Sequence, residues 1–244
     1  MESPLYIGLS RQVALRRHLE VVANNIANMN TVGFRADRML FETAMERVGS
    51  KRGEQVAFTI DRATYTDTRP GSFRETGRAL DLAIEGDGWI GVQTPEGVRY
   101  TRDARLSRAE DGGLVTVGGH PVLDDGGQPL QVPPDAETIA IGPDGTVTVD
   151  GNPLARIGLV RFEDQQGMRR GEQGLHATEE APQAAPDARL AQGKVESANV
   201  QPIVEMARMM DLSRDYQAVS RMVEEGHELL RSAIGRLGKA TQGT

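Results

Sequence analysis

The 244-residue chain contains no cysteine, few aromatic residues and no long apolar run. The lack of cysteine excludes disulfides and cysteine-based metal or redox chemistry. Aromatic residues make up 4% of the chain and hydrophobic residues 38%, which is lean for a compact domain of this length. We therefore expect small cores, an elongated shape and some apolar surface reserved for partners. Because no run of about 18 apolar residues occurs, we expect no membrane-spanning segment.

The net charge is −7, and it is unevenly distributed. Residues 1–52 carry +3, residues 53–200 carry −10, and residues 201–244 are neutral. A nucleic-acid partner needs a basic face, so the acidic middle argues against one. The start, Met1-Glu2-Ser3-Pro4, lacks the basic and apolar regions of a cleavable secretory signal, and we expect none.

Both ends of the chain carry apolar residues at alternating spacings of three and four. The N-terminal stripe is Leu5, Gly8, Gln12, Leu15, Leu19, Val22, Ile26 and Met29, and the C-terminal stripe is Met209, Leu212, Tyr216, Val219, Val223, Gly226, Leu230, Ala233 and Leu237. This spacing predicts a helix at each end and a coiled-coil-like seam. It is equally typical of an ordinary intramolecular bundle. Since the rest of the chain offers no clear further helix, the ends are expected to pair with each other, with other subunits, or with both.

The middle of the chain is patterned for strands. Leu80, Leu82 and Ile84 alternate with other residues, and Asp-Gly pairs such as Asp144-Gly145 and Asp150-Gly151 are typical of hairpin turns. The predicted fold class is α+β, with long N- and C-terminal helices forming a coiled-coil-like module around an all-β middle domain. The predicted segments are an N-terminal helix over 1–34, an extended connector over 35–80, a β-rich domain over 81–185, a return linker over 186–198 and a C-terminal helix over 199–244.

Motifs of known chemistry are incomplete. The segment from Gly86 to Gly91 matches G-x-G-x-x-G, but no helix can open at Val92-Gln93-Thr94-Pro95, so a β-turn is predicted. The four histidines are scattered, and the paired aspartates do not fit a calcium loop. We predict no catalytic residue, no cofactor and no metal. A glycosidase-type pair of carboxylates stays open from the sequence alone.

Four segments in order carry a family resemblance. The stretch from Val22 to Arg35, Val-Ala-Asn-Asn-Ile-Ala-Asn-Met-Asn-Thr-Val-Gly-Phe-Arg, resembles the N-terminal signature of flagellar rod and hook proteins. Residues 80–89, 100–116 and 196–217 resemble the later strands and the C-terminal signature of that family. The residues matched to the family motif are Asn24, Asn25, Asn28, Asn30, Thr31, Gly33, Phe34 and Asn199.

The resemblance implies a structural subunit of the bacterial flagellar basal-body rod. The opening segment is most similar to proximal-rod members, with a distal-rod protein as the alternative; a β-rich cell-wall-acting enzyme is a remote third hypothesis. The implied partners are other rod proteins, copies of the chain itself and the flagellar export apparatus. The implied location is the periplasmic rod, reached by type III export without a cleaved signal peptide. The stripes predict a subunit interface at Leu15, Leu19, Val22, Ile26, Met29, Met209, Leu212, Tyr216, Val219, Val223 and Leu230.

Overall fold

The computed structural model describes residues 3–47 and 55–240 of the chain, and within them the side chains of residues 7–40, 63–229 and 231–232. Contacts divide the chain into two compact units. The first, here called the helical unit, comprises Met1–Ala27, Asp37–Thr66 and Gln201–Thr244. The second, here called the β unit, comprises Asn28–Ala36 and Asp67–Val200. Both units are therefore assembled from segments far apart in the sequence.

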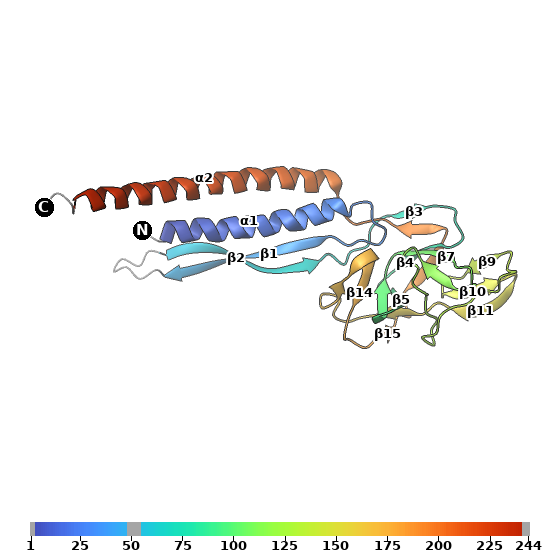
Figure 1. Ribbon diagram of the computed structural model, residues 1–244. Helices are drawn as coiled ribbons and strands as arrows, with labels where there is room; N and C mark the ends of the chain where they lie inside the picture. The colour runs from blue at the N-terminus through green and yellow to red at the C-terminus, as the bar shows by residue number, and fades with distance from the viewer. Residues whose placement is uncertain (1–2, 48–54, 241–244) are drawn as a thin grey trace. The chain divides into compact units, whose positions relative to one another are not determined.

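The helical unit contains two helices and a long β-hairpin. Helix α1 spans Ser3–Ala27 and helix α2 spans Pro202–Ala240, while strands β1 (Asp37–Arg47) and β2 (Gln55–Thr66) pair antiparallel. Proline at the first position of α2 costs no hydrogen bond, because that backbone group has no helical partner. Figure 1 shows α1 with α2 on one side and the hairpin on the other, and α1 contacts both.

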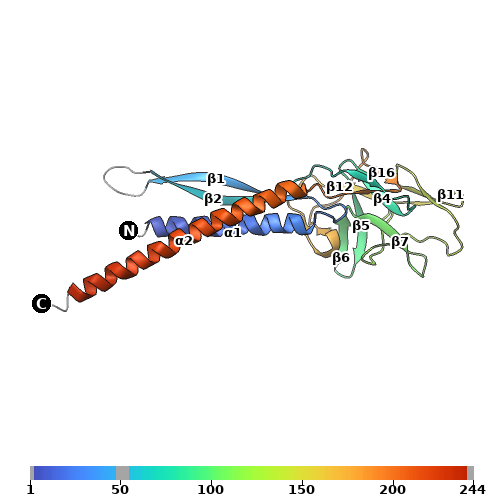
Figure 2. The same ribbon diagram turned by 90° about the horizontal axis from the view of Figure 1, so that it is seen from above.

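The prediction of a coiled-coil-like pair of terminal helices is wrong, although the α+β class fits. Helix α1 packs against strands as well as against α2, and Figure 2 shows α2 crossing α1 obliquely. A stripe spaced three and four identifies a buried helix face, but it does not say whether a helix or a sheet covers that face. Strands β1 and β2 supply the additional cover of α1.

The β unit is built from four small sheets of short strands, and its main core lies among them. The strands are β3 (Phe73–Glu75), β4 (Asp81–Glu85), β5 (Trp89–Thr94), β6 (Gly97–Thr101), β7 (Ala104–Arg108), β8 (Leu114–Thr116), β9 (Ile139–Ile141), β10 (Thr146–Val149), β11 (Asn152–Arg156), β12 (Leu159–Arg161), β13 (Arg169–Arg170), β14 (Leu175–Ala177), β15 (Gln183–Ala184), β16 (Arg189–Gln192) and β17 (Lys194–Glu196), with a 3-10 turn η1 at Glu172–Gly174. They form sheets ordered β13-β14-β6-β5-β12-β15, β16-β4-β7-β8, β11-β10-β9 and β17-β3.

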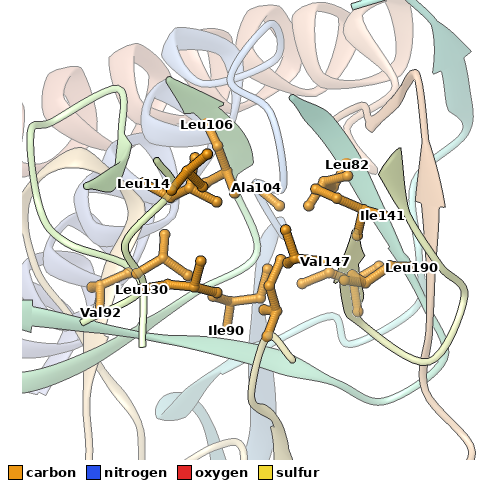
Figure 3. Close-up of a cluster of buried hydrophobic side chains, with 14 of the residues drawn as sticks. Leu82, Ile90, Val92, Ala104, Leu106, Leu114, Leu130, Ile141, Val147 and Leu190 are labelled. Carbon is orange, nitrogen blue, oxygen red and sulfur yellow. The ribbon is translucent and has the colours of Figure 1, made fainter. Parts of the chain in front are cut away.

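The main core lies among these sheets. Figure 3 shows side chains from several strands converging, among them Leu82, Ile90, Leu106 and Leu190. All four are at most 3% exposed. Strand β10 alternates half-buried and buried residues, as a strand with one buried face does. Strand β4, for which the sequence pattern indicated one buried face, is buried on both faces from Asp81 to Ile84.

One predicted hairpin turn is confirmed in detail. Val149 of β10 pairs with Asn152 of β11, and the two residues between them are Asp150 and Gly151. Their φ angles are 50° and 82°, the left-handed conformation that a two-residue hairpin turn requires at both positions. The predicted division into segments, with boundaries at 34, 80, 185 and 198, stays a prediction.

Candidate assembly site

The N-terminal signature, residues 22–35, begins near the end of α1 and continues into the β unit. Helix α1 ends at Ala27, and the Asn28 side chain accepts a hydrogen bond from the Thr31 hydroxyl at 3.2 Å. Gly33 follows with φ 69°, and a Cβ there would lie 2.8 Å from the carbonyl carbon of Arg102. A side chain would therefore meet rigid backbone, and glycine is required both by conformation and by space. Phe34 then packs in a small buried cluster with residues that include Val200.

Asn199 joins three passes of the chain in the β unit. Its Oδ1 accepts a hydrogen bond from the Ala36 amide at 2.7 Å. Its Nδ2 donates to the carbonyls of Asp67 and Arg69 at 2.9 and 2.8 Å. Its own amide donates to the Phe34 carbonyl at 3.2 Å. One carboxamide thus hydrogen-bonds backbone groups of two other segments at the place where three segments meet.

A buried ion cluster lies beside this junction, and Glu196 is at its centre. Arg102 donates to Glu196 Oε2 from Nε at 2.9 Å and from Nη2 at 2.8 Å. Arg35 Nη2 lies 3.6 Å from Oε1, which also accepts a hydrogen bond from the Gly71 amide at 3.1 Å. The side chains of Arg102 and Glu196 are 2% and 1% exposed. The backbone carbonyl of Glu196 accepts the Gly33 amide at 2.8 Å, so this residue holds the N-terminal signature through both its side chain and its backbone.

The two arginines of the cluster differ in how far hydrogen bonds and ion pairs compensate for their burial. Burial, and then the neighbouring Arg102 guanidinium, lower the pKa of Arg35 from 12.5 to about 10, while Glu196 opposes the shift. Arg102 in contrast donates to three backbone carbonyls, those of Ile84, Gly86 and Gly88, at 2.8, 3.1 and 2.6 Å. The Glu196 carboxylate is paired with both guanidinium groups.

Aromatic contacts extend the cluster. The Arg102 guanidinium lies 6.0 Å from the centre of the Trp89 ring, and Trp89 meets His176 edge to face with ring centres 4.7 Å apart. Arg170 lies over the Phe34 ring at 4.5 Å and donates to the Arg35 carbonyl at 2.7 Å. Trp89 is 5% exposed, so its ring is a buried contact of this region.

Two polar groups tie the hairpin to the helices of the helical unit. Asn25 is 1% exposed, and its carboxamide both accepts from the Asp37 amide and donates to the Asp37 carbonyl, each at 2.9 Å. Glu205 of α2 is also 1% exposed, and its Oε1 pairs with Arg38 and Arg208 at 2.7 Å each. Asn25 therefore binds α1 to β1, and Glu205 binds α2 to the same strand.

Most of the predicted interface residues are already partly covered within the chain. Val22 and Val219 are buried at 2% and 6% exposure. Those that are half-buried are Leu15, Leu19, Ile26, Met29, Met209, Leu212, Tyr216 and Val223. Met29 belongs to the β unit, where it packs with the Phe34 cluster. The Leu230 side chain lies outside the described residues.

The motif residues are divided between buried and exposed positions. Asn25, Phe34 and Asn199 make the contacts given above, whereas Asn24 and Asn30 are exposed. The structure adds three residues that the sequence analysis did not single out, Arg35, Arg102 and Glu196. The signal was a charged residue inside each matched segment, but its partner could not be inferred because the three residues are far apart in sequence.

Other large apolar side chains are exposed on the helices. They are Leu9 and Val13 on α1, and Ile203, Val204, Met206, Met210, Met222 and Leu229 on α2. Ile203 is 82% exposed and Leu229 is 70% exposed. Ile203, Met206 and Met210 follow at spacings of three and four on α2, so they share one face. An exposed apolar face of this kind is typical of a contact with another protein.

Clustered carboxylates in the β unit serve local structure. An open groove of about 720 Å³ runs along β12 and β15, and three aspartates are among its lining residues. Asp124 accepts hydrogen bonds from the amides of Gly126 and Gln128, and Asp125 pairs with Arg156 at 2.6 Å. The described residues include no group of three or more histidine, aspartate or glutamate side chains placed to hold a metal ion.

Neither helix, over the part that the structure describes, has a stretch apolar enough to cross a bilayer.

Buried polar contacts hold the N-terminal signature and the segment around Asn199 in place, and apolar side chains are exposed along both helices. These features define the class of structural assembly proteins. Comparison with known families gives the family. Residues 5–35 match the model described as "Flagella basal body rod protein", residues 83–149 match "Flagellar hook protein FlgE/F/G D1 domain", and residues 191–236 match "Flagellar basal body rod FlgEFG protein C-terminal".

Curated relatives agree over nearly the whole length. The flagellar basal-body rod protein FlgF of Caulobacter vibrioides is 40% identical, with 98% of this chain and 99% of the relative covered. FlgF of Mesorhizobium japonicum is 38% identical with the same coverage. FlgG of Bacillus subtilis is 29% identical, with 94% of this chain and 97% of the relative covered. The chain belongs to the flagellar basal-body rod protein family, whose members are structural proteins and not enzymes.

Proposed function

We propose that the chain is a structural subunit of the proximal flagellar rod, which assembles with copies of itself and with other rod proteins through its terminal helices and transmits torque. The observation that carries this proposal is the exposure of large apolar side chains along α2, up to 82% at Ile203. Exposed apolar area in contact with water lowers solubility, and burial against a partner removes that cost.

The proximal rod is favoured over the distal rod by the comparisons. The FlgF relatives are 40% and 38% identical to the chain, and the FlgG relative is 29% identical. The resemblance of the opening segment, residues 5–12, points the same way.

Delivery to the periplasm is proposed to use the flagellar type III export apparatus, without a cleaved signal peptide. The family membership supports this route. A chain that lacks residues 1–34 should then remain in the cytoplasm. Its appearance in the periplasm by the flagellar route would argue against the assignment of residues 1–34 to export.

Assembly through the helices is tested by Ile203→Asp in the full chain. Ile203 is 82% exposed in the subunit, so a carboxylate there stays in water unless a partner buries it, and burial without a partner for the charge costs several kcal/mol. We expect a variant that is exported, keeps a folded β unit and does not enter the rod. The matched control is Gln217→Asp, because Gln217 lies on the same helix and is exposed. Normal swimming by the Ile203 variant would contradict the proposal.

A further inference from the structure

Methionine supplies the only sulfur atoms of the chain, because the chain has no cysteine. Four of its nine methionines lie on α2, and they are Met206, Met209, Met210 and Met222. A two-electron oxidant such as hydrogen peroxide converts a thioether to a sulfoxide, provided that the oxidant reaches the sulfur. The exposure of each methionine therefore decides which of them are open to this modification.

The contacts of Glu205 fix which side of the first turns of α2 faces inward. Glu205 is 1% exposed, and its carboxylate pairs with Arg38 of β1 at 2.7 Å. Met209 follows four residues later on the same side of the helix and is half-buried. Met206 follows Glu205 and Met210 follows Met209, so both are turned by about 100° from the inward side. They are 44% and 56% exposed, and neighbouring methionines of one segment thus differ in their access to solvent.

The other methionines whose side chains the structure describes are covered to a greater extent or lie against α1. The half-buried ones are Met29, Met39, Met168 and Met209. Met222 is 52% exposed, but its Cε would lie 3.5 Å from a Cβ on Gly8, so the end of this side chain rests on α1. Met206 and Met210 are therefore the methionines that combine high exposure with a position on one open face.

Oxidation of Met206 and Met210 would change this face without disturbing the fold of the subunit. A sulfoxide is polar, and it stays hydrated on a side chain that is already exposed to water. Ile203, Met206 and Met210 share the face, so two sulfoxides would make most of an apolar surface polar. The isolated subunit loses little stability, whereas any contact that covers the face would have to bury two polar groups.

We propose that Met206 and Met210 form an oxidation site, at which hydrogen peroxide modifies the free subunit and prevents its entry into the rod. At each methionine the thioether sulfur attacks one peroxide oxygen, the O–O bond breaks and the S–O bond forms. Sulfur is oxidised by two electrons, and the peroxide is reduced to water, which leaves. Methionine sulfoxide reductases reverse such a modification, so it need not be permanent. The inference rests on the proposed function and adds a regulation of the face at the start of α2.

Mass spectrometry of the purified full-length chain tests the oxidation site. The chain would be treated with hydrogen peroxide and sampled over time, and the gain of one oxygen atom would be followed at every methionine by peptide fragmentation. We expect Met206 and Met210 to be oxidised several-fold faster than Met209, with the Tm of the chain unchanged at that stage. Met209 is the matched control, because it lies in the same turns of α2 and differs in burial. Equal rates at the three positions would overturn the inference.

Two double variants test what the modification does to assembly. Met206→Gln with Met210→Gln places neutral polar groups where the sulfoxides would be. Met206→Leu with Met210→Leu keeps apolar side chains of similar volume and cannot be oxidised. We expect several-fold less of the glutamine variant than of the leucine variant in purified basal bodies, although both should melt at the same temperature. The leucine variant should also be recovered in the same amount from cells grown with and without hydrogen peroxide, whereas recovery of the wild-type chain should fall with peroxide.

The possible results separate this inference from the proposed function. Equal amounts of the glutamine and leucine variants in basal bodies would overturn the inference and leave the proposed function standing. An equal loss of the wild-type and leucine chains in peroxide would do the same, because the loss would then have another cause. Absence of the wild-type chain from basal bodies would refute the proposed function, and this inference with it.

Discussion

Removing the charge of Glu196 tests whether the buried ion cluster holds the β unit together. The substitution Glu196→Gln keeps the shape of the side chain and removes the anion between two arginines. Arg102 and Arg35 are 2% and 5% exposed, so water cannot compensate for the loss. The glutamine carbonyl can still accept the Gly71 amide, but the NH2 group then replaces Oε2 opposite the Arg102 N–H donors, so the change removes the charge together with the hydrogen bonds that Oε2 accepts from Arg102.

The size of the effect follows from this geometry. Removing one partner of a buried ion pair costs about 3–5 kcal/mol, because an uncompensated charge stays buried. Arg102 keeps its three backbone carbonyl acceptors, so we expect the lower end, about 3 kcal/mol. In a unit of this size each kcal/mol shifts Tm by about 2–4 °C, which gives a decrease of roughly 6–12 °C.

Thermal unfolding of the full chain, followed by circular dichroism, measures this decrease. The control is Glu179→Gln, because Glu179 also pairs with an arginine but is 88% exposed. Exposed pairs contribute about 0–1 kcal/mol, so the control should melt close to wild type. If both variants melted together with the wild-type chain, the ion cluster would not stabilise the β unit and the argument from burial would fail.

Three further substitutions probe the ring contacts, the helix crossing and the signature turn. Burial lowers the pKa of His176 from 6.5 to about 4. The unfolded chain therefore binds the proton first, and the stability of the folded chain falls as pH drops from about 6.5 to 4. The variant His176→Phe should flatten this part of a plot of Tm against pH, whereas the control His227→Phe, on an exposed position of α2, should not. The variant Gly8→Ile should lower the protection of helix amides from hydrogen exchange, because the new side chain would collide with Val223. Adding Val223→Ala should recover part of the lost protection. Unchanged protection in Gly8→Ile would contradict the close approach of α1 and α2 at Gly8. Gly33→Ala should cost about 1–3 kcal/mol in thermal unfolding, from a φ of 69° and backbone contact, and wild-type stability would refute that strain.

The turns of the β unit could be predicted from sequence because their cause is local. Asp150 and Gly151 adopt left-handed backbone that few residue types tolerate, so the pair itself specifies the turn. The hairpin β1–β2 was missed although part of its signal is local too. Val56, Phe58 and Ile60 alternate with Ala57, Thr59 and Asp61, which is a strand pattern. Charged residues on either side of this segment made the strand pattern difficult to recognise in the sequence.

The assembly site could be predicted only in part, because its contacts are not local. The signature residues Asn25, Gly33 and Asn199 were found by resemblance, and the structure supplies a physical role for each. Glu196 could not be matched to Arg35, since 160 residues separate them and many other carboxylates were available. The residues of the two stripes are partly covered within the chain, but periodicity does not distinguish cover by the same chain from cover by another. Their role as a subunit interface stays a prediction.

The central claim is that the chain is a component of the flagellar rod, and its location tests that claim most directly. Basal bodies would be purified from cells whose only copy of the chain carries a small tag, and the tag would be located by immunogold labelling. The account predicts label on the rod in every preparation that retains motility, together with loss of filaments when the chain is removed. Intact rods and filaments in cells that lack the chain, or label found only in the cytoplasm, would contradict it.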